Sequence, residues 1–458
     1  MKNLPLLCFA FLLLISCRPA HTYFYVSADG NDNNTGTHKN PFKTLQKAQN
    51  SIRMLPLAER EKQIIVRIDK GIYKLDDPLI FGPEDSAPEK GSVIFSGMPG
   101  KNVEISGGNE IKNWEKRSDG IWVAKCSLPE NYDFRELFID DNRAVRARHP
   151  DEGFLRIAKA GEDRRTNFYF NRNDFPLPEN PSEVELVLLH DWSITRIGLS
   201  GIDSLQHIIT AKDSIGAKTI DFFKIDNWEK NPRYFLENSM AFLDAENEYF
   251  YNRKEGLVYL KLKEGESPEG KKIVIPALSS GLLRLTGYEN NKIRNIRFEN
   301  ITFSYCSWPL PADGYAGIQA CYFDPRGKEK DKWDVVPAAV EGEFCENCSF
   351  VSCRFLHLGG SGLWLGTGAE NCLISGCHFE DISGNGIMIG EGNDRTVGGE
   401  LWWKKTPSQA ASGNRIEKST VRACGKQFFG AVGIWCGLAA RTSILNNQIS
   451  DLPYTGIS

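Results

Sequence analysis

The strongest constraint on the fold of this chain is a repeat of about two dozen residues towards its C-terminal end. Short apolar segments begin with glycine and start 24, 47 and 23 residues apart, at Gly362, Gly386, Gly433 and Gly456. An asparagine opens each unit, at Asn347, Asn371, Asn414 and Asn446 or Asn447. The spacing of 47 residues is one repeat plus an additional segment, mainly at 391–413. Short strands at this period, with glycine and asparagine at the corners, are typical of a parallel β-helix.

We therefore predict an all-β fold in which residues 286–458 form a right-handed parallel β-helix. Stacked strands of such a coil lie about 4.8 Å apart, and each backbone group pairs with the turns above and below. Alternation along the strands predicts a set of inward side chains, namely Leu363, Leu365, Ile387, Ile389, Ile434 and Cys436. It predicts a second set in one outward file, namely Trp364, Met388, Trp435 and Ser458. The alternative repeat fold, a leucine-rich horseshoe, has a different signature that is not found here.

The cysteines follow the same period. Cys348 and Cys372 are 24 residues apart, and so are Cys353 and Cys377. Together with Cys345 they could also suggest a zinc site, and disulfides are an alternative in an oxidising compartment. The shared period favours stacked inward thiols, because cysteine behaves as a small apolar side chain. We predict no metal and no other cofactor.

The period disappears between 111 and 285, where short apolar strands alternate with turns. This pattern predicts an inserted all-β region, similar to a β-sandwich. Residues 18–110 contain an amphipathic helix from about Pro41 to Met54 and apolar strands near 64–68, 93–97 and 103–107. We interpret this segment as a cap helix followed by the first turns of the coil.

The final repeat is incomplete, because the strand that starts at Gly456 stops at Ser458. An open end of a β-helix exposes unpaired backbone groups and an apolar core, so a polar cap normally covers it. We therefore expect the chain to be C-terminally truncated, with further turns beyond Ser458.

The N-terminus has the pattern of a bacterial lipoprotein signal. Lys2 precedes an apolar run at 4–15, which is too short to span a bilayer, and residues 14–17 read Leu-Ile-Ser-Cys. We predict a signal peptide at 1–17 and a lipid anchor on Cys17; a plain secretory signal is the alternative. Residues 18–22 lack the acidic cluster of many surface-exposed lipoproteins of the Bacteroides type, which favours the periplasm over the cell surface. The formal net charge of −4 disfavours nucleic acid and strongly anionic polymers as partners.

Several segments resemble the parallel β-helix enzymes of glycoside hydrolase family 141, which are similar to fucosidases and xylanases. The resemblance extends over about 23–458 and rests on residues 23–32, 40–48, 136–150, 233–238, 247–259 and 451–458. It implies a secreted enzyme that cleaves glycosidic bonds. The family's proposed catalytic aspartates lie on turns in its C-terminal half, and we expect the corresponding positions after Ser458.

Within the present sequence, candidate catalytic carboxylates are Asp381 and Asp451, which occupy the same position in different repeats. His357 and Ala423 fill that position in the other two repeats. Asp381 and Asp451 would lie two turns apart, roughly 9–10 Å, near the upper limit of the separation in inverting glycosidases. An alternative is that each aspartate caps backbone amides at a corner.

The additional segment and the outward aromatic file supply further candidates. Glu391 and Asp394 begin the segment and are candidates for catalysis or for lining a groove. Candidate sugar-binding residues are Trp364, Trp435, Trp402, Trp403, Tyr454 and Arg395, because pyranose rings pack against aromatic faces. The alternative is that another part of the chain covers these tryptophans. Arg143, Arg146 and Arg148 could form salt bridges between domains or bind a carboxylated sugar.

The hypothesis that follows is a monomeric, exported glycoside hydrolase that acts on plant or host oligosaccharides and polysaccharides through a pair of carboxylates. A polysaccharide lyase is the first alternative; it would need a lysine or arginine base and usually an acidic Ca²⁺ cluster on the outward face. The second alternative is a glycan-binding lipoprotein without catalytic activity.

Overall fold

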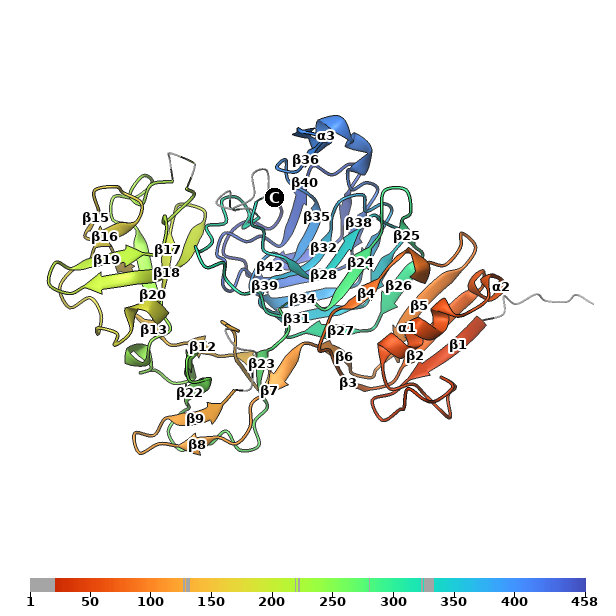
Figure 1. The fold of residues 1–458 in the computed structure, drawn as a ribbon, viewed down its shortest axis with the longest axis horizontal. Helices are drawn as coiled ribbons and strands as arrows, with labels where there is room; N and C mark the ends of the chain where they lie inside the picture. Colours follow the sequence, from red (N-terminus) through yellow and green to blue (C-terminus); the bar gives the residue numbers. More distant parts are fainter. Residues whose placement is uncertain are drawn as a thin grey trace, which may run out of the picture.

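The computed structural model describes residues 21–126, 128, 132–218, 220, 223–279, 281–322, 324 and 333–458. Nearly all of its regular structure is β-strand (Figure 1). The longest helix in these ranges is α1 (Leu45–Arg53), with nine residues. In the same ranges, no helix has the length and apolar character that crossing a bilayer requires. The predicted signal peptide and Cys17 lie outside the described residues.

Most of the chain forms a coil of three sheets, in which all strand pairs are parallel. The first sheet contains, in order, β1 (His21–Val26), β2 (Gln63–Ile68), β5 (Ser92–Gly97), β26 (Ile296–Glu299), β30 (Ser349–Val351), β33 (Leu373–Ser375), β38 (Arg415–Glu417) and β41 (Ser443–Leu445). The second sheet contains β3 (Gly71–Lys74), β6 (Val103–Ser106), β27 (Thr302–Ser304), β31 (Arg354–Leu358), β34 (His378–Ile382), β39 (Thr420–Cys424) and β42 (Gln448–Ser450).

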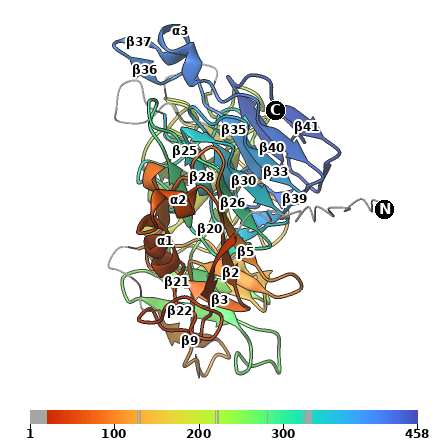
Figure 2. The ribbon, with the colours of Figure 1, turned by 90° about the vertical axis from the view of Figure 1, so that its right-hand side faces the viewer.

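The third sheet contains β4 (Leu79–Phe81), β24 (Leu283–Thr286), β28 (Ala338–Glu343), β32 (Ser361–Leu365), β35 (Ile387–Gly390) and β40 (Ile434–Gly437). From β2 onwards, the strands of these sheets follow one another in the order first, second, third, so each circuit adds one strand to each sheet. Figure 2 shows strands of the first sheet following one another from red to blue. This is the stacked arrangement that the repeat predicts.

Inward side chains of successive turns lie in columns. Leu363 pairs with Ile387, Ile387 with Ile434, and Ile434 with Ile457, as the alternation predicts. In the second sheet, Phe355 stacks between Phe303 and Phe379, with ring centroids 5.2 and 4.4 Å apart. Burying each such ring contributes roughly 1.5–3 kcal/mol, so these columns hold the turns together.

The cysteines are part of the same core. Cys345, Cys348, Cys353, Cys372 and Cys377 are buried in it, and Cys345 Sγ lies 3.7 Å from Cys372 Sγ. All cysteines in the described ranges are free thiols, so the prediction of stacked inward thiols is confirmed and that of disulfides is not.

The helix α1 covers the first turn of the coil. Thr44 caps its N-terminus by accepting a hydrogen bond from Lys47 N. Leu45, Ala48 and Ile52 are buried in the core of the coil. A short helix, α2 (Leu57–Arg60), follows before β2.

The insertion leaves the coil after β6 and returns at β24. One of its sheets joins β11 (Asn142–Arg143), β10 (Phe138–Ile139), β23 (Ile273–Pro276) and β7 (Gly108–Glu110). A second joins β12 (Val145–Arg146), β21 (Glu248–Asn252), β22 (Leu257–Lys261), β9 (Trp122–Lys125) and β8 (Glu115–Lys116). Its largest sheet joins β13 (Arg148–His149), β20 (Arg233–Glu237), β17 (Glu185–Leu189), β18 (Ile194–Asp203), β19 (Ile208–Ala211), β16 (Asn167–Tyr169) and β15 (Lys159–Ala160), with β14 (Leu155–Arg156) beside β20.

The insertion differs from the coil in its pairing. Its strands pair antiparallel, apart from β12 with β21. It has two hydrophobic cores of its own and three sheets, more than the two sheets of a simple sandwich. In Figure 1 it lies to the left of the coil and below it. The additional segment near 391–413 forms β36 (Thr396–Val397), β37 (Glu400–Leu401) and α3 (Trp402–Lys405), at the top of that view.

Candidate active site

A cavity of about 640 Å³ lies between the outward face of the second sheet and the insertion. Residues of β6, β27, β31, β34 and β39 line it from the coil, and residues of β11, β12, β13 and β20 line it from the insertion. Its volume lies within the range of about 300–1,000 Å³ that is common for ligand sites. We call it the cleft.

A single file of side chains runs along the coil at the edge of the second sheet. Its residues have left-handed backbones, with φ between 52° and 57°: Tyr305, His357, Asp381, Ala423 and Asp451. At His357 and Asp381 the parallel ladder skips one position, because the flanking residues Leu356 and Leu358 pair with Glu380 and Ile382. The skipped residue is pushed out of the ladder. We call these five residues the bend file; it contains the position that Asp381 and Asp451 share in the sequence repeat.

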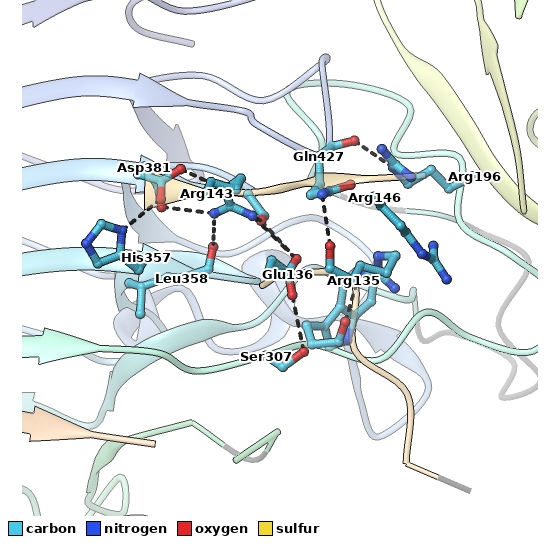
Figure 3. A network of polar contacts seen from close by, with 12 residues as sticks. Arg135, Glu136, Arg143, Arg146, Arg196, Ser307, His357, Leu358, Asp381 and Gln427 are labelled. Carbon is cyan, nitrogen blue, oxygen red and sulfur yellow. Dashed lines mark hydrogen bonds and ion pairs between the residues drawn. The ribbon is translucent and has the colours of Figure 1, made fainter. Parts of the chain in front are cut away.

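Asp381 is held by one residue from the insertion and one from the coil (Figure 3). Arg143 Nε donates to Asp381 Oδ1 at 2.7 Å, and His357 Nδ1 lies 2.8 Å from Asp381 Oδ2. The Asp381 side chain is only 14% exposed. Burial by itself would raise the pKa of this carboxyl group, but the charge of Arg143 and the hydrogen bonds from His357 and Arg143 outweigh it. The pKa of Asp381 therefore lies well below its usual range, and the group is a carboxylate at neutral pH.

Arg143 is itself fixed by several partners, of which Figure 3 shows Asp381, Glu136 and Leu358. Its Nη1 donates to Ser383 Oγ at 3.2 Å and lies 3.8 Å from Glu136 Oε1. Its Nη2 donates to the carbonyl oxygen of Asp381 at 3.2 Å. The guanidinium also lies over the Phe138 ring, 5.0 Å from its centroid. Because its whole fork is engaged, Arg143 presents a single orientation to Asp381.

Tyr305 and Asp141 form a second pair in the cleft. Tyr305 Oη donates to Asp141 Oδ1 at 2.5 Å, and Lys272 Nζ lies 3.0 Å from the same oxygen. Burial and the neighbouring Asp141 charge raise the pKa of Tyr305, so its hydroxyl stays protonated. The Tyr305 ring stacks on His357, with centroids 5.3 Å apart, which continues the bend file towards Asp381.

The insertion is anchored to the coil by a buried ion network. Arg196 Nη1 lies 2.6 Å from Glu185 Oε1 and 2.8 Å from Glu237 Oε2, and Arg146 Nη1 lies 2.9 Å from Glu185 Oε2. Arg196 Nε donates to the carbonyl oxygen of Gln427, which belongs to the coil, at 2.7 Å. These contacts hold the insertion wall of the cleft in place.

The other predicted carboxylates lie in different settings. Asp451 is exposed near the C-terminal end and accepts a hydrogen bond from Ser450 Oγ at 3.1 Å. Glu391 forms two hydrogen bonds with Arg395, at 2.6 and 2.8 Å. Asp394 accepts from Trp333 N at 3.2 Å, and burial raises the pKa of its carboxyl group. The structure thus brings Asp381 and Asp451 into one file, and it places Glu391 and Asp394 elsewhere.

Glu391 belongs to a second cavity of about 280 Å³ over the outward face of the third sheet. Trp435 lines it and stacks on Tyr322 at 3.9 Å between ring centroids. Trp364, Met388 and Trp435 are adjacent in register, as predicted, but Met388 is completely buried. The connection between β27 and β28 covers much of the file, which corrects the expectation of an open aromatic strip.

The remaining predicted sugar-binding residues differ in exposure. Trp402 is 1% exposed, and its Nε1 donates to Gly392 O, so its ring has no free face for a sugar; that prediction is corrected. Trp403 is 38% exposed with Lys404 over its ring, and Tyr454 is half-buried beside the Trp435 cluster. Arg395 is taken up by Glu391 and Gln409.

Three residues of the cleft could not be assigned from the sequence. They are Arg143, as the partner of Asp381, and the pair of Asp141 and Tyr305. Arg143 and Asp381 are 238 residues apart, and no local pattern connects them. For Tyr305, the irregular spacing of its turn hid its place in the bend file. Its position directly after the strand at 302–304 is the signal that could have revealed it.

Comparison with known proteins agrees with this architecture. Residues 119–262 match the model of the GH141 insertion domain. This range lies within the insertion, so the region that is similar to a GH141 insertion domain forms one wall of the cleft. No curated protein matches the chain.

The solved structures add information on the fold. One described as a glycoside hydrolase is 24% identical, with a TM-score of 0.84 over 95% of this chain and 79% of that chain. This likeness shows a common fold. A complex of XylC with xylose is 12% identical, with a TM-score of 0.48 over 94% of this chain and 59% of that chain. A GH136 lacto-N-biosidase from Eubacterium ramulus is 10% identical, with a TM-score of 0.36 over 91% of this chain and 43% of that chain. These two structures differ too much from this chain to support a conclusion about it.

Proposed function

We propose that this chain is a glycoside hydrolase of the family 141 type and that the cleft is its active site. The observation that carries the proposal is the bend file, in which Asp381 and Asp451 lie on either side of Ala423; Asp381 and Ala423 line the cleft, and Asp451 follows them one turn further along the file. The GH141 insertion domain and the fold shared with a glycoside hydrolase support it. We propose that the coil is a right-handed parallel β-helix, because right-handed connections predominate between parallel strands.

The proposed mechanism is inversion. Asp381 and Asp451 are separated by two turns of the coil, roughly 9–10 Å, close to the upper limit of about 9.5 Å for an inverting pair. Asp381, held as a carboxylate, is suited to activate a water molecule. Asp451 would then protonate the leaving oxygen. The small side chain of Ala423 leaves room between them for the scissile bond.

Arg143 and His357 are positioning residues in this mechanism. They orient the two Asp381 oxygens and keep the group ionised, which a base requires. A general base must also retain access to water. Arg143 and His357 each engage one oxygen, which leaves a further lone pair on each for a water molecule.

The finer features of the function are also proposals. We infer that the substrate is a fucosylated or xylan-type glycan from plants or a host, and that the reaction needs no redox cofactor. We infer that the protein is an exported monomer anchored through a lipid on Cys17. Trp364, Trp435, Trp403 and Tyr454, with Glu391 and Asp394 nearby, would hold a distant part of a long substrate at the second cavity.

The test is release of reducing ends from xylan-type and fucosylated oligosaccharides by the full chain. Asp381→Asn and Asp451→Asn should each lower kcat/KM by about 10²–10⁴-fold, the range for loss of an acid or base. Asp203→Asn is the matched control, because Asp203 only caps a turn of the insertion. Unchanged activity in both aspartate variants would contradict the proposal.

One observation favours a second candidate function, a polysaccharide lyase. The cleft contains Lys426, an exposed amine on the wall that also carries Asp381, and a lyase needs such a base. Cleavage by elimination leaves an unsaturated product with ultraviolet absorbance. Appearance of this absorbance, without incorporation of oxygen from labelled water into the product, would favour the lyase over the hydrolase.

A further inference from the structure

The cluster of arginines in the insertion splits into two functional groups in the structure. Arg143 and Arg146 are paired with carboxylates, Asp381 and Glu185 respectively. Arg148 also lines the cleft, but no carboxylate among the described residues lies within ion-pair distance of it. Its guanidinium donates only to the carbonyl oxygens of Pro150 and Gly153.

Arg148 is prepared for an anion by its surroundings. The guanidinium lies over the Phe235 ring, 3.9 Å from the centroid, which fixes its plane. Burial lowers the pKa of Arg148, and the charges of Glu237, Glu248 and Asp151, none of them within ion-pair distance of the guanidinium, offset this effect only in part. A partly buried arginine without an acidic partner gains stability from a bound anion, because the anion replaces the water that the guanidinium has lost.

Two cations on the opposite wall of the cleft share this property. Lys426 and Arg354 are exposed residues of the coil that line the cleft. Within the ranges the structure describes, neither side chain forms a hydrogen bond or an ion pair. Both are therefore available to a ligand.

The acidic residues of the cleft are, in contrast, almost all neutralised. Asp381 is paired with Arg143, Asp141 with Lys272, and Glu380 with Arg422. Glu237 is paired with Arg196. Among the described residues of the cleft, Glu104 is the carboxylate without a cationic partner, and it accepts a hydrogen bond from Ser304 Oγ at 2.7 Å. Three unpaired cations and one unpaired carboxylate give the cleft a surplus of positive charge.

We propose that the cleft selects an anionic glycan, whose uronate carboxylate or sulfate ester binds to Arg148 and Lys426. This inference rests on the proposed function and names the class of its substrate. Arginine matches the geometry of a carboxylate or sulfate with two parallel hydrogen bonds, and lysine adds a mobile positive charge. The walls of a cleft focus this charge, although the net charge of the whole chain is −4.

The test is binding of two pairs of oligosaccharides to the full chain, measured by calorimetry at low and at high salt. One pair is an oligogalacturonide and its carboxyl-reduced form, and the other is a κ-carrageenan oligosaccharide, whose charge comes from sulfate esters alone, and its desulfated form. We expect at least one acidic member to bind about tenfold more tightly than its neutral counterpart, with weaker binding at high salt. The pair that shows the difference tells whether a carboxylate or a sulfate is recognised.

Variants locate the effect. Arg148→Gln and the double variant Lys426→Gln with Arg354→Gln should each weaken acidic binding by about tenfold and leave neutral binding unchanged. The double variant changes exposed side chains and so keeps the fold intact even if Arg148→Gln does not. Lys254→Gln, an exposed lysine outside the cleft, is the matched control and should bind as the unmodified chain does.

The outcomes separate this inference from the proposed function. Equal binding of acidic and neutral members in both pairs, absence of binding, or unchanged binding by the double variant overturns the anionic selectivity. Hydrolysis of neutral glycans without charge preference overturns it as well, but supports the hydrolase. Tight binding of an acidic glycan without any cleavage supports the selectivity and contradicts the hydrolase.

Discussion

The coil and the insertion form opposite walls of the same cleft, but they are built in different ways. In the coil, each residue of the bend file lies beside its counterpart in the next turn, so the file follows from a local repeat. In the insertion, the short strands β11, β12 and β13 bring Arg143, Arg146 and Arg148 to the cleft, through contacts that are distant in sequence. The repeat of the coil therefore determines where Asp381 lies. Arg143, from the insertion, supplies the positive charge that keeps Asp381 ionised.

The largest expected effect tests whether the coil and the insertion are separate packing units. Phe355→Ala removes the middle ring of a column and should lower the free energy of unfolding by about 4 kcal/mol. In hydrogen exchange, the loss of protection should spread through neighbouring turns of the coil, since each turn packs only on its neighbours. Phe168→Ala, in the core of the insertion, should lower protection there and leave the coil unchanged. If either variant lost protection equally in the coil and in the insertion, the two would not be separate packing units.

A second experiment breaks the link between the two walls. Arg196→Met leaves Glu185 and Glu237 buried with fewer partners and should cost about 3 kcal/mol in urea unfolding. Arg164→Met is the control, because its pair with Asp226 is partly exposed and should contribute less than about 1 kcal/mol. A cost at Arg196 no greater than at Arg164 would mean that the buried network does not anchor the insertion.

The smallest effect concerns the ionisation of Asp381. Its folded pKa is depressed below the unfolded value of about 3.9, so its contribution to stability is complete above that pH and is lost as the pH falls below it. Arg143→Gln removes the cation, so the folded pKa of Asp381 should rise; a rise of about one unit corresponds to a loss of ~1.4 kcal/mol, and the midpoint of acid unfolding should move to higher pH. Circular dichroism during acid titration measures the shift, and Lys74→Gln, in an exposed pair with Asp76, should show none. A midpoint that stays in place would show that the insertion does not control this carboxylate.

Sequence reasoning succeeded where a side chain's position depends on its own strand. The column through Leu363, Ile387 and Ile434, and the common register of Asp381 and Asp451, were both predictable from spacing. The prediction that Trp402 binds a sugar was wrong, because the sequence does not show which other segments cover a side chain. For the same reason, the spacing predicted that Met388 points out of the coil but not that its side chain is buried.

By itself, the sequence determined that the chain coils and which side chains point into the coil. These properties depend on the two-residue alternation of strands and on a period near 24 residues, which are both written locally along the chain. Only the tertiary structure decided that Arg143 reaches Asp381 while Arg148 stays without an acidic partner. That choice depends on how a separately folded insertion packs back onto the coil, and no short-range pattern encodes the distance between two such surfaces.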